Sequence, residues 1–174
     1  MKKIIISVLI VLLVASSAIA LDLSSFPNMF LDEVRVVVGK SAAAEDVVGA
    51  IDIMAALQQR AGRFRRLDNA ILDTEVRSLD SKNSIIIGGP CINSAAARVM
   101  GFPENCMEGF EMGKGVIKLY EFDNGKLALL AAGTTALDTR RVTTVLSNYK
   151  DYDLDGMEMV IAGLNINNIN VNTK

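Results

Sequence analysis

The chain has 174 residues, 51% of them hydrophobic and 22% charged, and its net charge is −2 at pH 7. This weakly acidic balance argues against nucleic-acid binding, which relies on concentrated Lys and Arg. The sequence contains no His and no Trp. Without His there is no Ser-His or Cys-His nucleophile pair and no usual neutral-pH general base, so most familiar hydrolase mechanisms are excluded.

The first twenty residues are typical of a secretory signal. Lys2 and Lys3 precede the apolar run 4–14, and small residues then lead to an A-x-A end at 18–20. This run is shorter than the roughly 20 residues that span a bilayer, and polar residues follow it. We therefore expect cleavage before Leu21, which leaves no membrane span; a retained anchor is the alternative.

The remaining chain has the size of one domain. We divide the sequence into a signal peptide (1–20), an N-terminal lead segment (21–33), a single α/β domain (34–163) and an Asn-rich C-terminal tail (164–174). In the tail, isoleucines and a valine alternate loosely with Asn. This pattern fits either an exposed edge strand or a disordered segment.

One unit occurs three times: an aliphatic strand, a glycine turn and a capped helix. Uninterrupted aliphatic runs predict strands that are covered on both faces. Ser41, Asn93 and Thr135 are suitable N-caps, and Asp138 completes a capping-box spacing with Thr135. The predicted strands are 34–38, 84–87 and 126–132, and the helical patterns that follow them run from 41 to 60, from 93 to 100 and from 135 to 149. We predict an α/β fold with a mixed, mainly parallel sheet and helices on both faces.

Two of the helical patterns have an apolar face that we expect to be turned toward the core. These faces are Val47, Ile51, Met54 and Ala55 in the first helix, and Val142, Val145, Leu146 and Tyr149 in the third. A basic cluster ends the first helix, where it would complement the helix dipole; an anion or partner site is the alternative. The cluster consists of Arg60, Arg63, Arg65 and Arg66.

A β-hairpin separates the second and third units. Residues 115–122 alternate between apolar and polar, and Asn124-Gly125 favours a tight turn into the strand that begins near Lys126. One strand must then run antiparallel, which makes the sheet mixed. A last strand is predicted at 157–162.

Cys91 and Cys106 are the only cysteines. In a secreted protein we expect them to form a disulfide, which would contribute about 3 kcal/mol by closing a loop of this size. Two free thiols are the alternative. A redox pair would more often show C-x-x-C spacing.

The glycine turns resemble phosphate-binding loops only superficially. No G-x-G-x-x-G or G-x-x-x-x-G-K-[ST] follows Gly39, Gly88 or Gly133, and Pro90 removes an N–H that a phosphate would need. We therefore expect no nucleotide and no other cofactor.

The acidic residues suggest no metal site. Asp151, Asp153 and Asp155 have the spacing of a calcium loop, but Ala162 stands where that loop needs a Glu. We expect a solvated turn there and complementation of helix dipoles by acids at the helix starts. Of Arg140 and Arg141, one is expected to pair with a carboxylate and one to face water. No metal ligand and no catalytic residue is predicted.

Three motifs resemble the domains of archaeal S-layer proteins. They are the G-G-P-x-x-N turn (Gly88, Gly89, Pro90, Asn93), the G-x-G-V-I strand start at 113–117, and the helix start with Gly133, Asp138, Thr139 and Arg140. The resemblance covers about residues 34–162. A weaker similarity exists to the repeated cell-wall-binding modules of bacterial surface proteins.

The resemblance implies a secreted, non-catalytic structural or interaction protein of the cell surface, as an S-layer component or accessory. Its expected partners are further copies of itself or other envelope proteins. One alternative is a secreted small-molecule- or cell-wall-binding module. Another is a secreted α/β enzyme that uses Asp138, Arg140 and the glycine turns, which would need a pocket at the carboxyl ends of the strands.

Overall fold

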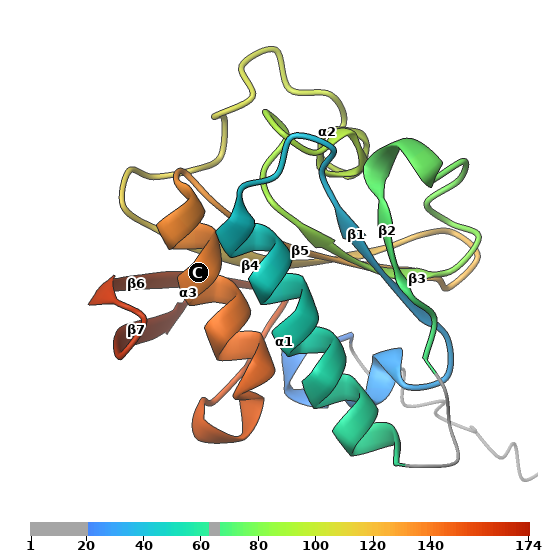
Figure 1. The fold of residues 1–174 in the computed structure, drawn as a ribbon, viewed down its shortest axis with the longest axis horizontal. Coiled ribbons are helices and arrows are strands. Elements are labelled where there is room, and N and C mark those ends of the chain that lie inside the picture. The colour runs from blue at the N-terminus through green and yellow to red at the C-terminus, as the bar shows by residue number, and fades with distance from the viewer. Residues whose placement is uncertain (1–20, 63–66) are drawn as a thin grey trace, which may run out of the picture.

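The computed structural model describes residues 21–62 and 67–174, which form a seven-stranded mixed sheet in the order β2-β1-β3-β5-β4-β6-β7 (Figure 1). Strands β2, β1, β3 and β5 are mutually parallel, while β4 runs antiparallel to β5 and β6, and β7 runs antiparallel to β6. The predicted mixed α/β sheet is therefore confirmed. The strands are β1 (Val34–Val38), β2 (Ala70–Leu72), β3 (Asn83–Ile87), β4 (Gly115–Glu121), β5 (Leu127–Gly133), β6 (Glu158–Asn165) and β7 (Asn168–Thr173).

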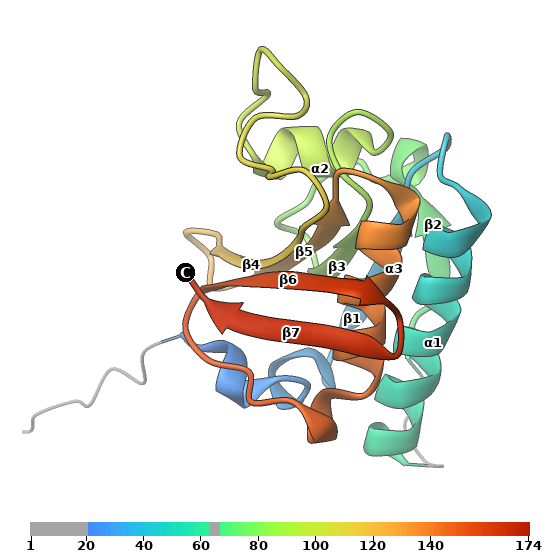
Figure 2. The same ribbon diagram turned by 90° about the vertical axis from the view of Figure 1, so that its left-hand side faces the viewer.

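The described part of the chain has three α-helices: α1 (Ala44–Ala61), α2 (Ser94–Val99) and α3 (Ala136–Ser147). Helices α1 and α3 lie side by side, and α2 lies apart from them (Figures 1 and 2). Short 3-10 turns span Leu23–Ser25, Asn28–Phe30, Asp73–Glu75 and Tyr149–Asp151. None of the helices in the described ranges is both long and apolar enough to cross a membrane.

Side chains from the central strands enter two separate clusters, because successive residues of a strand point to opposite faces. One cluster contains Val36 and Val38 together with buried residues of α1 and α3. The other contains Val37 with Ala95 and Ala96 of α2. The aliphatic runs read from the sequence are therefore strands that are buried on both faces.

Two of the three predicted N-caps are confirmed. Asn93 Oδ1 accepts hydrogen bonds from the N–H groups of Ala95 (2.9 Å) and Ala96 (3.4 Å). Thr135 caps α3 through the predicted capping box with Asp138.

The prediction of Ser41 as the N-cap of the first helix is wrong. Helix α1 begins at Ala44 with Ala43 as its cap, and Asp46 Oδ2 accepts a hydrogen bond from the Ala43 N–H at 3.2 Å. The Asp46 carboxylate thus accepts one backbone N–H at the amino end of α1, where a hydroxyl cap was predicted.

The predicted apolar face of α1 is wrong for Val47, Ile51 and Ala55, which are exposed, whereas Met54 packs against the core as predicted. The core receives Ala50, Ile53 and Leu57 instead. Gly49 explains this orientation, since α1 approaches α3 so closely there that an added Cβ would lie 2.4 Å from Thr143 Oγ1. The predicted face of α3 is confirmed, with Val142, Val145 and Leu146 fully buried and Tyr149 packed beside the same cluster.

The hairpin and the chain ends complete the sheet. Gly125, with a φ of 76°, donates its N–H to the carbonyl of Phe122 in the predicted turn between β4 and β5. Strand β6 extends beyond its predicted end, and the Asn-rich tail forms the edge strand β7. In the lead segment, Leu23 and Phe30 are fully buried.

Two predictions fall on residues that the structure does not describe. They are the signal peptide at 1–20 and three members of the basic cluster, Arg63, Arg65 and Arg66. The fourth member, Arg60, donates a hydrogen bond to Asn28 Oδ1 at 2.9 Å.

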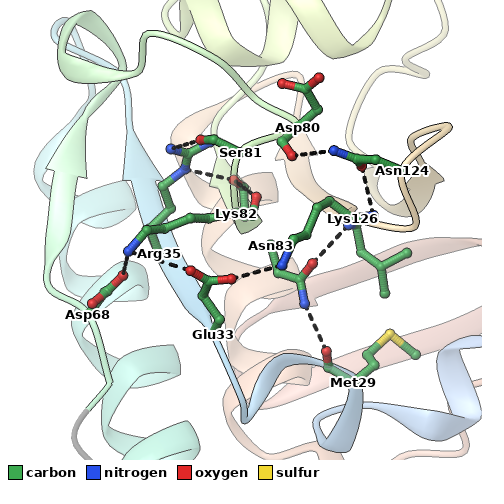
Figure 3. A network of polar contacts seen from close by, with 12 residues as sticks. Met29, Glu33, Arg35, Asp68, Asp80, Ser81, Lys82, Asn83, Asn124 and Lys126 are labelled. Atoms are coloured by element: carbon green, nitrogen blue, oxygen red, sulfur yellow. Dashed lines mark hydrogen bonds and ion pairs between the residues drawn. The ribbon is translucent and has the colours of Figure 1, made fainter.

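A polar network at the amino ends of β1 and β3 fixes the lead segment and the hairpin to the sheet (Figure 3). Glu33 pairs with Lys126 at 2.8 Å, and the bond from Lys126 is the main reason why the pKa of the Glu33 carboxyl is lowered. Asn83 donates to the carbonyl of Met29 at 3.1 Å. Buried Arg35 donates to Ser84 Oγ at 2.9 Å. Every side chain named here has partners, so we interpret this end of the sheet as structural.

Candidate functional site

A small crevice lies at the carboxyl ends of the parallel strands β1, β3 and β5. These strands are neighbours in register, and the chain leaves β1 and β5 toward α1 and α3 but leaves β3 toward α2. In open α/β sheets, ligands bind where the connections of neighbouring strands diverge in this way. The crevice has a volume of about 170 Å³.

The turns that form the crevice approach one another closely, and two glycines make this possible. A Cβ added at Gly39 would lie 2.2 Å from the carbonyl oxygen of Ile92. A Cβ added at Gly133 would lie 2.3 Å from Asp138 Cβ. Gly39 follows β1, and Gly133 ends β5. The absence of a side chain at each of them therefore lets the turns around the crevice pack closely.

The structure gathers part of the predicted motif set at this crevice. Gly89, Gly133 and Thr139 line it, together with both cysteines. Asn93 is buried as the cap of α2 and donates to the carbonyl of Ile87 at 2.8 Å. The remaining motif residues do not line the crevice: Gly88, Pro90, Asp138 and Arg140.

Asp138 is buried and fully engaged in positioning the start of α3. Its Oδ2 accepts hydrogen bonds from Thr134 Oγ1 (2.6 Å), the Thr135 N–H (2.9 Å) and Thr135 Oγ1 (2.8 Å). Its Oδ1 pairs with Arg141, which also donates to the carbonyl of Gly113 at 2.9 Å. These contacts account for both carboxylate oxygens.

The expectation that one of Arg140 and Arg141 faces water is wrong. Arg141 is buried against Asp138, and Arg140 pairs with Asp52 of α1 at 2.6 Å. Both arginines have partners because α3 lies between α1, which supplies Asp52, and the start of β4, where Gly113 supplies its carbonyl. Arg140 therefore ties the two long helices together and stands away from the crevice.

Among the residues that the structure describes, Asp46 is the one charged residue that lines the crevice, and it is 1% exposed. Its Oδ2 binds the Ala43 N–H, whereas its Oδ1 is buried without a hydrogen-bond partner. Burial raises the pKa of the Asp46 carboxyl, and the neighbouring charge of Glu45 adds to the shift. Sequence reasoning interpreted Asp46 only as a helix-start acid; its position in the first turn after a glycine loop was the available signal.

The predicted disulfide between Cys91 and Cys106 is confirmed, with 5.0 Å between the two Cα atoms. It links the long loop between α2 and β4 to the turn that precedes α2, and both cysteines line the crevice. Met107 and Phe110 of this loop form part of the wall. The disulfide therefore holds one side of the candidate site in place.

The aspartates of the predicted solvated turn, Asp151, Asp153 and Asp155, are all exposed. Within residues 21–62 and 67–174, no group of three or more His, Cys, Asp or Glu residues is placed to hold a metal ion.

A second surface of interest is the outward face of α1, which we call the α1 outer face. It comprises Val47 (44% exposed), Val48 (45%) and Ile51 (61%). Val47 also lines a shallow hollow with Leu72 of the edge strand β2, and Leu72 is itself exposed. Apolar side chains thus continue from the helix onto the edge of the sheet.

The chain matches no known protein-family model and no curated protein. Its function has to be argued from the crevice and the α1 outer face.

Proposed function

We propose that this protein is a secreted, non-catalytic interaction protein of the cell surface, of the S-layer type, which associates through the α1 outer face. The observation that carries the proposal is that the middle of α1, from Val47 to Ile53, carries apolar side chains on both sides of the helix. Ile53 is buried in the core, while Val48 and Ile51 project from the opposite side and remain exposed. Helices that are apolar all round are ordinarily buried, and contiguous exposed apolar patches mark interaction sites.

The sequence supports the cellular context of this proposal. The charged and apolar pattern of residues 1–20 is typical of export, and the disulfide fits an oxidising compartment. The proposed three strand-glycine-helix units, with helices on both faces of the sheet, agree with the resemblance to archaeal S-layer domains. Export, a disulfide-linked fold and the exposed, apolar α1 outer face together favour a component or accessory of a surface coat.

The start of α3 does not support the alternative of an enzyme that uses Asp138. The polar groups at the start of α3 bind one another, since Asp138 is held by Thr134, Thr135 and Arg141. A catalytic acid or base needs a free position for substrate, which Asp138 lacks.

A second copy of the same chain is the partner that the α1 outer face fits best. In an antiparallel pair of α1 helices, the exposed residues Val48 and Ile51 of one copy would pack against the same residues of the other. Small residues at the exposed positions Ala44 and Ala55 would let the two helices approach closely. Such a contact is isologous, the commonest symmetry of homo-oligomers.

Analytical ultracentrifugation of the exported, oxidised protein over a wide concentration range tests the proposal. We expect concentration-dependent self-association that Ile51→Lys abolishes, because a lysine there would place like charges at the symmetric contact. The matched control is Leu164→Lys, which introduces the same charge at an apolar residue that is 84% exposed on β6. A wild-type protein that stays monomeric, or loss of association in the control alone, contradicts the proposal.

A further inference from the structure

The crevice at the carboxyl ends of β1, β3 and β5 has the size and lining of a small ligand site. Its volume of about 170 Å³ is close to that of a cavity of about 150 Å³ that holds benzene. Its walls are mainly apolar and include Ile92, Met107, Phe110 and Ala136. These observations are independent of the α1 outer face and of the function proposed above.

One residue of the crevice lining also carries a buried polar atom that the protein itself leaves unsatisfied. Asp46 Oδ1 has no hydrogen-bond partner, although the residue is 1% exposed and lines the crevice. Buried carboxylate oxygens without partners are rare in native structures, because the lost hydration is not replaced. A hydrogen-bond donor on a ligand would supply the missing partner.

The charges around the crevice favour a cation over an anion. No Lys or Arg from residues 21–62 and 67–174 lines it. The amino ends of α1 and α3 could attract an anion through their free N–H groups. However, Asp46 binds the N–H of Ala43, and Asp138 binds that of Thr135, so each helix start already carries its own carboxylate. The Phe110 ring in the wall offers an aromatic surface that also suits a cation or an aryl group.

We propose that this crevice binds a small primary amine with an apolar body. The ammonium group donates a hydrogen bond to Asp46 Oδ1, and the hydrocarbon part packs against Ile92, Met107 and Phe110. Phenethylamine is a suitable probe, because its aryl ring has the size of benzene, which binds in a cavity only slightly smaller than this crevice.

Isothermal titration calorimetry of the exported, oxidised protein with three probes of nearly equal shape tests this assignment. The probes are phenethylamine, the neutral 2-phenylethanol and the anionic phenylacetate. We expect phenethylamine to bind at least about tenfold more tightly than the alcohol, and phenylacetate not to bind. Asp46→Asn should weaken phenethylamine binding at least about tenfold, because the amide is uncharged.

Two further variants keep the test decisive. Asp52→Asn makes the same change on the same helix outside the crevice, and it should leave phenethylamine binding unchanged. Gly89→Leu should abolish binding by filling the crevice, which Gly89 lines. A Cβ at Gly89 meets the Gly133 carbonyl and Phe110 only at 3.8 Å, so the backbone there has room for a side chain to begin. This variant therefore tests the crevice even if Asp46→Asn fails to fold.

The proposal is overturned if the wild type binds none of the probes, if phenylacetate binds as tightly as the amine, or if the folded Asp46→Asn variant retains full affinity. The monomeric Ile51→Lys variant should still bind phenethylamine. Loss of self-association and loss of amine binding can therefore be distinguished.

Discussion

Gly49→Ala should destabilise the protein, although the same change at an exposed helical position would stabilise it by about 1 kcal/mol. The added Cβ would lie 2.4 Å from Thr143 Oγ1 and 2.8 Å from Thr143 Cβ and Cγ2. Thr143 is fully buried, and its branched side chain has few rotamers into which it can move. The helices must therefore separate, and overpacking of this kind costs about 1–3 kcal/mol.

After subtraction of the gain in helix propensity, we expect Gly49→Ala to lower the free energy of unfolding by up to about 2 kcal/mol. Urea denaturation followed by circular dichroism measures this as a lower midpoint with an unchanged slope. In the Thr143→Ala background, Oγ1 and Cγ2 are absent, so the same substitution should cost less. A neutral or stabilising Gly49→Ala, or an equal cost in both backgrounds, would refute the close contact between α1 and α3.

Three further predictions concern the charged residues and the disulfide. Arg141→Ala should lower the free energy of unfolding by about 3–5 kcal/mol, because it leaves the buried Asp138 carboxylate without its cation. Arg140→Ala should lower it by less than about 1 kcal/mol, because its partner Asp52 is 40% exposed. Denaturant titration compares the two variants. Because burial raises the pKa of Asp46 above 3.8, the folded state binds its proton more tightly, and this residue makes the protein less stable as the pH rises above that value. Asp46→Asn should therefore gain stability relative to wild type between about pH 3 and about pH 7 in thermal melts, and a constant difference would contradict this. Replacing Cys91 and Cys106 by Ser should cost about 3 kcal/mol in the same denaturation assay and weaken phenethylamine binding, because the loop that carries part of the crevice wall is then released.

The parts of the fold that sequence predicted well are those decided by local chemistry. The aliphatic runs are buried on both faces as strands, and Asn93 and Thr135 cap their helices because each side chain reaches N–H groups two or three residues away. The hairpin turn at Asn124-Gly125 is equally local. Such features depend on near neighbours in the chain, so tertiary packing does not have to be known.

The face that α1 turns to the core was not predictable in this way. Val47 and Ile51 have helical spacing, and so do Ile53 and Leu57, so periodicity alone allows either face to be buried. The choice is made by Gly49, whose missing side chain lets α3 approach. The short strand β2 also escaped prediction, because its three residues are partly exposed and carry no long aliphatic run.

The candidate site was predictable in its position but not in its chemistry. Sequence reasoning identified the glycine turns that meet at the carboxyl ends of the strands, because parallel strands bring these turns together. It could not show that Cys106 would bring Met107 and Phe110 over the crevice, since a disulfide does not fix the path of the loop that it closes. It also could not show that Asp46 would be buried with one oxygen unpartnered.

The two acidic helix starts show how equal sequence positions acquire different roles. Asp46 and Asp138 occupy the same position in the first turns of α1 and α3, and each accepts the N–H of its own N-cap residue. Asp138 gains a buried arginine and two threonine hydroxyls, which satisfy both its oxygens. Asp46 gains none of these, so one of its oxygens is left without a partner, and among the described residues no Lys or Arg lines the crevice. Because both helix starts already carry a carboxylate, this crevice is unsuited to phosphate, and its unmet requirement is for a donor that brings positive charge.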